Sequence, residues 1–302
     1  MKILAINFSQ SGQLDEIIEN FISPLNNVSI ERVKFNTSKQ FDFPWTIPSF
    51  FDAMPESVKE IPAPLKPINF ESEKYDLIVF GYQPWFLSPS IPTTSLLKDP
   101  KFMEIMKDTP LVTIVGSRNM WLNSQESVVR LIQQANGKII GNLPLIDKSS
   151  NILSAASILH WMLTGRKEKK WGIFPMPGIS DEDIQGASKF GKILNNCISK
   201  NTLDNFQNEL VAANGLTINT NILFIEGRAK MIFNAWATLI LKKEAQGKKR
   251  RFWVSFFKYY LIIALFVVSP FVVLIYNVLV RPFTSKSIRE KKKKYTFLGM
   301  KV

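Results

Sequence analysis

Residues suited to binding a phosphate lie near the start of the chain, in the run Ser9-Gln10-Ser11-Gly12-Gln13-Leu14. The run follows the apolar stretch Lys2–Phe8 and leads into Gln13–Ile22, where apolar residues recur at helical spacing. A helix N-terminus presents unpaired backbone N–H groups and a partial positive charge, which suit a phosphate group. The two serines add hydroxyl groups, and the glycine lets the backbone approach closely. We interpret the run as a phosphate-binding loop; the alternative is an ordinary tight turn between a strand and a helix.

Two motifs are missing from the sequence, and their absence restricts the class of phosphate compound that the loop could bind. There is no Gly-x-Gly-x-x-Gly and no acidic residue at the end of the second predicted strand, which disfavours a dinucleotide site. There is also no Gly-x-x-x-x-Gly-Lys-Ser/Thr, which disfavours ATP or GTP bound by a P-loop. A single phosphate monoester is the ligand that remains.

Two further loops combine aromatic and polar residues, and they follow the predicted strands Tyr75–Gly81 and Leu111–Gly116. In open α/β sheets, ligands bind at the carboxyl ends of the parallel strands. A flat ring needs a stacking surface and a few hydrogen-bond partners at its edge. The alternative is that the tryptophans of these loops only cap the sheet. The candidate ring-binding residues are Gln83, Pro84, Trp85, Phe86, Leu87, Gly116, Ser117, Arg118, Asn119 and Trp121.

The elements that must position these loops alternate between strand and helix. Tyr75–Gly81 and Leu111–Gly116 are continuously apolar, as strands buried on both faces of a parallel sheet are. The alternation predicts an α/β fold with a doubly wound parallel sheet. The other predicted elements are the strands Lys2–Phe8, Val28–Phe35 and Lys138–Ile146 and the helices Gln13–Ile22, Ser124–Ala135 and Ser180–Ser199.

Two stretches exceed a minimal α/β sandwich. Asp42–Pro67 is rich in proline and aromatic residues, which predicts a long ordered excursion over the sheet edge or the site. Asn151–Gly165 is apolar on nearly all sides and too short to cross a bilayer. We expect a buried helix there; the alternative is a lid or an apolar wall beside the site.

At the phosphate loop the chain resembles the flavodoxin-like family, including its quinone-reductase branch. The family's loop has the form Ser/Thr-x-Ser/Thr-Gly-x, which Ser9–Gln13 matches. The resemblance covers roughly residues 1–199 and implies that FMN is bound by this loop together with Gln83–Leu87 and Gly116–Trp121. Leu14 departs from the family, since a hydroxyl residue is common there, so one phosphate contact is in doubt.

A more specific similarity extends over nearly the whole chain. The runs INFSQSGQLDEII, FPWTIPSFFDAMPES and GYQPWFLSPSIPTTSLL resemble proteins of dialkylresorcinol and flexirubin pigment biosynthesis in bacteroidetes, known as condensing enzymes. The resemblance implies an oxidation that turns a dialkyl-cyclohexanedione, made by a separate ketosynthase, into an aromatic resorcinol. Condensation itself would need an activated cysteine with histidine partners, and Cys197 lies late in a predicted helix with His160 as the single histidine.

Two other functions remain open. One is a membrane-bound NAD(P)H:quinone reductase, and the other is a membrane-tethered flavin electron carrier without a substrate of its own. The candidate catalytic residues are Tyr82 and His160 as bases and Arg118 as a cation that stabilises reduced flavin. The alternatives are a core histidine for His160 and a surface salt bridge for Arg118. A His/Cys zinc site is excluded, because Cys197 is the only cysteine, and no metal is expected.

The end of the chain carries the charge excess. The chain has 302 residues and a net charge of +13, and from Lys242 onward it has 15 basic but only 2 acidic residues. Within this part, Tyr259–Val280 contains no charged residue and is long enough to cross a bilayer. Basic runs flank it, and Pro270 interrupts it, so a re-entrant hairpin competes with a single span.

Together with the resemblance, this charge pattern divides the chain into three expected parts and indicates the kind of partner. Residues 1–200 form the flavodoxin-like FMN-binding domain, residues 201–251 a helical connector, and residues 252–302 a helical membrane anchor with a basic tail. A neutral body with a basic tail favours membrane lipids over nucleic acid. The start of the chain is too short an apolar run for a signal peptide, so the catalytic domain is expected on the cytoplasmic side. The resemblance adds a lipophilic substrate and, as partners, a ketosynthase and an acyl carrier.

Overall fold

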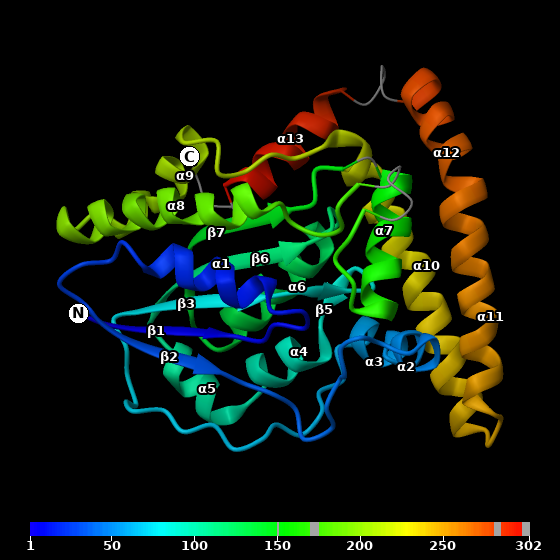
Figure 1. Cartoon of the computed structure of the whole chain (residues 1–302), viewed down its shortest axis with the longest axis horizontal. Coiled ribbons are helices and arrows are strands. Elements are labelled where there is room, and N and C mark those ends of the chain that lie inside the picture. Colours follow the sequence, from blue (N-terminus) through cyan, green and yellow to red (C-terminus); the bar gives the residue numbers. More distant parts are fainter. Residues whose placement is uncertain (150, 170–174, 281–284, 298–302) are drawn as a thin grey trace.

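The computed structural model describes residues 1–149, 151–169, 175–280 and 285–297. Its centre is a five-stranded sheet with the order β2-β1-β3-β6-β7, and every neighbouring pair is parallel (Figure 1). This is the flavodoxin-like doubly wound order, so the predicted fold class is confirmed. The strands are β1 (Lys2–Asn7), β2 (Ser29–Lys34), β3 (Leu77–Tyr82), β6 (Pro110–Ser117) and β7 (Lys138–Ile146).

Helices cover both faces of this sheet. On one face α1 (Gln13–Ile22), α8 (Asp181–Ser199) and α9 (Phe206–Ala212) pack with the strands into one apolar cluster. On the other face, α4 (Ile91–Leu97), α5 (Pro100–Met106) and α6 (Leu122–Gln134) share a second cluster with the strands. Figure 1 shows α1 and α8 in front of the sheet and α4 and α5 behind it.

The long insertions gather beyond the carboxyl ends of the strands. The proline-rich excursion contains α2 (Ile47–Asp52) and α3 (Met54–Val58), and the apolar stretch after β7 forms α7 (Asn151–Thr164). The loop after β3 makes a two-stranded antiparallel pair, β4 (Pro84–Trp85) and β5 (Ser88–Pro89). Figure 1 places α2, α3 and α7 together at this end of the sheet.

The last third of the chain begins with a 3₁₀ turn, η2 (Leu203–Asn205), and then forms a helical hairpin along this same end. α10 (Thr220–Ala245) runs down the molecule, and α11 (Arg250–Ile263) returns beside it (Figure 1). The returning helix continues through η3 (Ala264–Val268), α12 (Ser269–Ile275) and η4 (Tyr276–Val280), of which η3 and η4 are π-helical. The π-helical turn directly precedes Pro270, whose missing N–H disturbs regular α-helical bonding.

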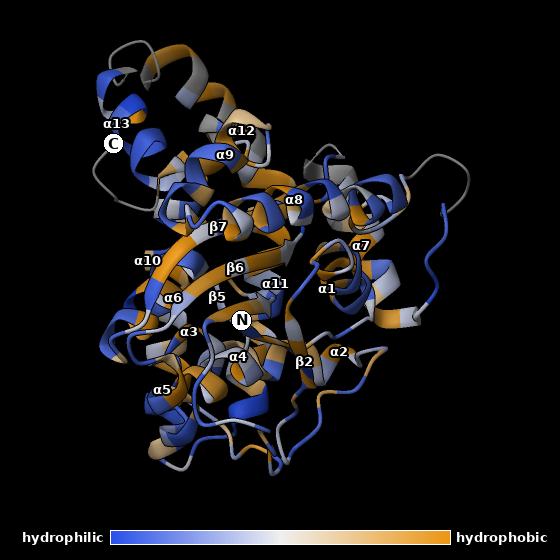
Figure 2. Cartoon of the chain, turned by 90° about the vertical axis from the view of Figure 1, so that its left-hand side faces the viewer, coloured by the Kyte–Doolittle hydropathy of each residue, from blue (hydrophilic) through white to orange (hydrophobic). Residues whose placement is uncertain are grey.

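Among the described residues, one helix is long and apolar enough to cross a membrane, namely Arg250–Val268. The predicted membrane unit, residues 252–302, includes residues 281–284 and 298–302, which lie outside the described part. Further along the chain, α12 is mainly hydrophobic, whereas α13 (Ser285–Thr296) is mainly hydrophilic (Figure 2).

Arg250 fixes the beginning of α11 to the globular body. Its guanidinium lies 2.6 Å from both Asp52 and Glu56 and 2.8 Å from Glu244. It also donates to the Asp52 backbone carbonyl. Asp52 and Glu56 belong to the proline-rich excursion, so one cation joins α11 to α2 and α3. One member of the basic run expected at the membrane is therefore used inside the protein.

Candidate functional site

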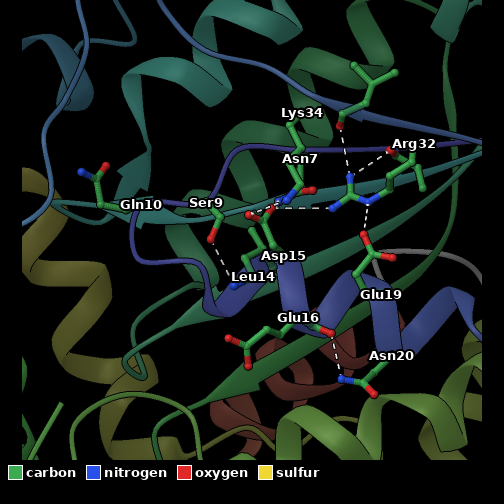
Figure 3. A network of polar contacts seen from close by, with 12 residues as sticks. Asn7, Ser9, Gln10, Leu14, Asp15, Glu16, Glu19, Asn20, Arg32 and Lys34 are labelled. Carbon is green, nitrogen blue, oxygen red and sulfur yellow. Dashed lines mark hydrogen bonds and ion pairs between the residues drawn. The ribbon is translucent and has the colours of Figure 1, made fainter.

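The predicted phosphate loop is a tight turn that leads directly into α1. Gly12 has a left-handed backbone, with φ of 88°, and its carbonyl accepts from the amides of Asp15 and Glu16. Ser9 Oγ accepts from the Leu14 amide at 3.2 Å across the turn (Figure 3). The Ser9 side chain thus shapes the loop, and the left-handed conformation explains the glycine.

The first turn of α1 is acidic, but its charge is matched on the sheet side. Asp15 accepts from Asn7 Nδ2 at 2.8 Å and lies 3.0 Å from Lys34 Nζ and 3.6 Å from an Arg32 nitrogen (Figure 3). These contacts join the beginning of α1 to β1 and β2. They also offset a carboxylate that would otherwise repel a phosphate at the same helix end.

Glutamine side chains join the phosphate loop to its neighbours. Gln10 donates through its backbone amide to Gln83 Oε1 at 2.8 Å, and its Nε2 donates to the Phe41 carbonyl at 2.7 Å. Gln13 donates through Nε2 to the Ile179 carbonyl at 3.0 Å and accepts from the Ile179 amide at 3.3 Å. The loops after β1 and β3, the excursion and the segment before α8 are therefore held in one arrangement.

One cavity of about 610 Å³ opens where these segments meet. Its volume lies within the ~300–1,000 Å³ that is typical of cofactor pockets. Of the residues predicted to bind the cofactor, those that line it are Ser11, Gln13, Leu14, Gln83, Pro84, Trp85, Phe86, Leu87, Gly116, Ser117 and Arg118. The structure therefore brings the three predicted loops to one cavity.

Four predicted residues do not line this cavity. Ser9 and Gly12 shape the turn, and Asn119 is buried beside it. Trp121 is 2% exposed and belongs to the apolar cluster on the α6 side of the sheet. Of the two loop tryptophans, only Trp85 faces the cavity, and Trp121 caps the sheet.

Aromatic rings form one wall of the cavity. Trp85 meets Trp45 and Phe41 edge to face, with ring centroids 5.1 Å and 5.0 Å apart. Phe43 makes a similar contact with Trp161 at 5.7 Å. Of these aromatic residues, the four that line the cavity are Phe43, Trp45, Trp85 and Trp161. Such a wall suits the face of a flat ring.

Three buried polar atoms in residues that line the cavity have no hydrogen-bond partner among the described residues. They are Gln10 Oε1, Trp45 Nε1 and Ser117 Oγ. Buried polar groups in native proteins nearly always have partners, so atoms of this kind indicate an additional binding group. These three residues are therefore candidates to contact the edge of a bound heterocycle.

Arg118 brings a positive charge to the cavity. Burial lowers the pKa of its guanidinium, while the carboxylate of Asp147 acts to raise it. Asp147 is itself held by the Ser149 amide and the Ser154 hydroxyl. An arginine stays protonated at neutral pH despite such a shift, so the site keeps a cation in a poorly solvated position.

Tyr82 and His160, the two predicted bases, lie outside the described cavity lining. The Tyr82 side chain is fully buried and donates to Gln125 Oε1 at 2.5 Å. Burial raises its pKa well above the usual value, and the nearby Glu226 adds to the effect. His160 Nε2 lies 3.4 Å from Glu168 Oε1.

The helical hairpin and α7 supply cavity residues that the sequence did not single out. Ile158, Trp161 and Met162 of α7 form an apolar wall, as the alternative interpretation of this helix proposed. From the C-terminal helices, the lining residues are Phe224, Ile225, Arg228, Ala229, Ile232, Phe233, Tyr260, Leu261, Ala264, Leu265, Val268, Ser269 and Val272. Only the apolar composition of these segments could have indicated this role.

Solved structures with a similar arrangement are flavoproteins and flavodoxins. A flavoprotein in complex with FMN from Lactobacillus acidophilus NCFM is 17% identical, with a TM-score of 0.38 over 47% of this chain and 92% of that chain. A flavodoxin from the domain Archaea is 10% identical, with a TM-score of 0.36 over 66% of this chain and 99% of that one. No protein-family model and no curated protein sequence matches the chain. Because these values are low, function must be inferred from the chain's own residues.

Proposed function

We propose that this chain is a flavin-dependent oxidoreductase that binds FMN with its phosphate at the beginning of α1. If the five strands of the main sheet are numbered from 1 to 5 along the chain, their order in the sheet is 2-1-3-4-5. In sheets of this order the ligand site lies where the strand order reverses, which here is between β1 and β3. The loops after these two strands are joined here by the bond from Gln10 to Gln83. The observation that carries the proposal is one cavity lined by the phosphate loop and an aromatic wall, with unpartnered buried polar atoms in three of its lining residues.

The residues present fit FMN in three respects. Ser11 and Gln13 line the cavity at the beginning of α1, where the helix dipole favours an anion. Trp45 and Trp85 offer a surface to the ring system, and Gln10, Trp45 and Ser117 offer polar atoms to its edge. Bound FMN would supply the capacity to accept a hydride from an organic substrate.

The other groups of the cavity favour an apolar substrate that forms an anion. Among the described residues that line it, the charged side chains are Arg118 and Arg228, and none is a carboxylate or an imidazole. A cyclic 1,3-dione loses a proton without the help of a strong base, because the negative charge of its enolate is delocalised over two oxygens. A cation such as Arg118 stabilises that enolate. The apolar residues around it exclude water from the reaction.

We assign the reaction as aromatisation of a dialkyl-cyclohexanedione to a dialkylresorcinol. The substrate would lose two hydrogens, formally a hydride and a proton, to become a resorcinol, and bound FMN would supply the hydride acceptor. Its two alkyl chains would extend along the apolar part of the cavity between α10 and η3. A ketosynthase and an acyl carrier would supply the dione. The proposed location is the cytoplasmic membrane, with the sheet domain on the cytoplasmic side.

Anaerobic single-turnover mixing tests this function. The FMN-loaded chain in detergent is mixed with a dialkyl-cyclohexanedione, and flavin absorbance is followed while the product is identified by mass spectrometry. We expect flavin bleaching and one resorcinol per flavin. No bleaching by the dione, together with rapid bleaching by NAD(P)H and reoxidation by quinone, would instead identify a quinone reductase. A flavin that is reduced reversibly but converts neither substrate would identify an electron carrier.

A further inference from the structure

The outer side of the C-terminal helix is an exposed apolar stripe. From α11 to η4 the large hydrophobic side chains that point outward are 38–64% exposed. At 1.5 Å per residue, the distance from the first to the last is about 40 Å. Soluble monomers rarely expose contiguous apolar surface of this size. The stripe consists of Phe252, Phe256, Tyr259, Ile262, Ile263, Val267, Val268, Phe271, Val272, Leu274, Ile275, Val278 and Leu279.

The other side of this helix is attached to the body along its length. Phe257 is fully buried against α2 and α10, in a cluster that includes Phe51 and Ile240. Further along, Tyr276 is 2% exposed and stacks on Phe224 of α10 with ring centroids 3.7 Å apart. A helix that crossed the bilayer alone would have no such contacts in its second half.

The segment after the helix also returns to the body. Tyr295 of α13 donates to Glu126 of α6 at 2.8 Å, and Lys294 lies 3.1 Å from the same carboxylate. Gln207 of α9 donates to the Thr296 carbonyl at 2.6 Å. The helix is therefore attached to the same body at its beginning, through Arg250, and through the segment that follows it.

Exposed basic residues flank the stripe at both ends. Lys248, Lys249 and Arg251 precede it, and Lys286, Arg289 and Lys291–Lys294 follow it, all exposed to solvent. Apolar residues between two basic groups match the surface of a leaflet that contains anionic lipids. The charge complementarity thus favours lipid over a second copy of this chain. The basic ends of a second copy would repel the basic ends of the first.

We infer that the helix from α11 to η4 lies flat in one leaflet of an anionic membrane, with the stripe among the acyl chains and the body outside. This arrangement is neither a span nor a re-entrant hairpin. Ile232, Val268 and Val272 are partly exposed and also line the cavity. The cavity therefore reaches the stripe, and a lipophilic molecule dissolved in the leaflet meets its opening directly. The inference concerns membrane geometry, so it does not depend on flavin binding.

Depth measurements on vesicles test this geometry. Single cysteines replace Phe256, Ile263, Phe271 or Val278 in a full-length Cys197→Ser background, and each receives a nitroxide label. The protein is bound to vesicles made of equal parts phosphatidylcholine and phosphatidylglycerol. We expect all four labels at a similar shallow depth of roughly 5–10 Å below the headgroups. Labels near the bilayer centre at Ile263 and Phe271, with the outer two near opposite surfaces, would overturn the inference.

A flotation assay tests the stripe and its charges separately. Replacing Val267, Phe271 and Leu274 by serine is expected to lower the vesicle-bound fraction at least tenfold. Serine at Ile47, Ile61 and Met176, which are exposed hydrophobic residues elsewhere, serves as the control and should change binding less than twofold. Binding should also fall on vesicles of phosphatidylcholine alone. Unchanged binding by the stripe variant, or a stable dimer in solution that covers the stripe and does not bind vesicles, would contradict the inference.

Discussion

Glu226 of α10 is a buried carboxyl that holds the beginning of α6, and its titration should determine how stability depends on pH. Its Oε1 accepts from the Asn123 amide at 2.7 Å, and Asn123 Nδ2 donates to the Glu226 carbonyl at 2.7 Å. It is 1% exposed, and its Oε2 has no partner among the described residues. Burial raises its pKa to about 7, although the amides of Asn123 and Leu122 act to lower it.

The size and sign of the effect follow from the raised pKa. Between pH 4.5, the usual pKa of a glutamate, and about pH 7, the folded protein keeps a proton on Glu226 that the unfolded chain has lost. Stability therefore falls as pH rises through this window and levels off above it. A difference of this size corresponds to about 3 kcal/mol, at 1.36 kcal/mol per pKa unit. Glu226→Gln removes the titration but keeps an acceptor for the Asn123 amide.

Urea unfolding of the full chain in mild detergent at pH 5, 6, 7 and 8 measures this effect. The stability of Glu226→Gln relative to the unaltered protein should rise by about 3 kcal/mol from pH 5 to pH 8. Glu60→Gln is the matched control. Burial acts to raise the pKa of Glu60, but hydrogen bonds from Arg130 and Ser127 outweigh it and the pKa is lowered. Its relative stability should stay constant in this range. A pH-independent difference for Glu226→Gln would refute the reasoning.

Three further substitutions test other parts of the structure. Arg250→Ala should lower the free energy of unfolding by about 2–4 kcal/mol, because it leaves a cluster of carboxylates without their shared cation. Thermal unfolding measures the loss. The control Arg251→Ala, at an exposed neighbour, should lower the free energy of unfolding by less than about 0.5 kcal/mol. Ser11→Asp should weaken FMN about 100-fold but riboflavin less than threefold, because only FMN carries the repelled phosphate; fluorescence titration measures both, and equal losses would place the phosphate elsewhere. Gly178→Ala should lower stability by about 1–3 kcal/mol, since its backbone has φ of +85° and a Cβ would lie 2.6 Å from Gln13 Oε1; an unchanged melting temperature would contradict this.

Local sequence patterns were sufficient for the sheet and for the meeting of three loops at one cavity. Continuous apolar runs predicted β3 and β6, and the run Ser9–Leu14 was placed correctly between a strand and a helix, although the left-handed backbone of Gly12 was not predicted. The loops after β1, β3 and β6 meet at one cavity because parallel strands end at the same edge. These features depend on periodicity and turn chemistry, which adjacent residues determine.

Features that depend on distant contacts could not be predicted. Glu226 meets Asn123 across 103 positions, and Arg250 meets Asp52 across 198. The direction of a loop side chain is equally hidden, since Trp85 turns to the cavity and Trp121 to the core. The apolar tail was interpreted from its length, its lack of charge and its basic flanks. Whether such a helix crosses a bilayer or lies along a protein depends on partners such as Phe224 and Glu126.

Flavin binding by the purified chain is the most direct test of the central claim. The full-length protein in detergent is incubated with FMN and passed through a size-exclusion column while absorbance and bound flavin are recorded. We predict about one FMN per chain eluting with the protein, with its fluorescence quenched by the aromatic wall at Trp85 and Trp45. Protein that elutes without flavin and does not quench FMN fluorescence in titration would contradict the account.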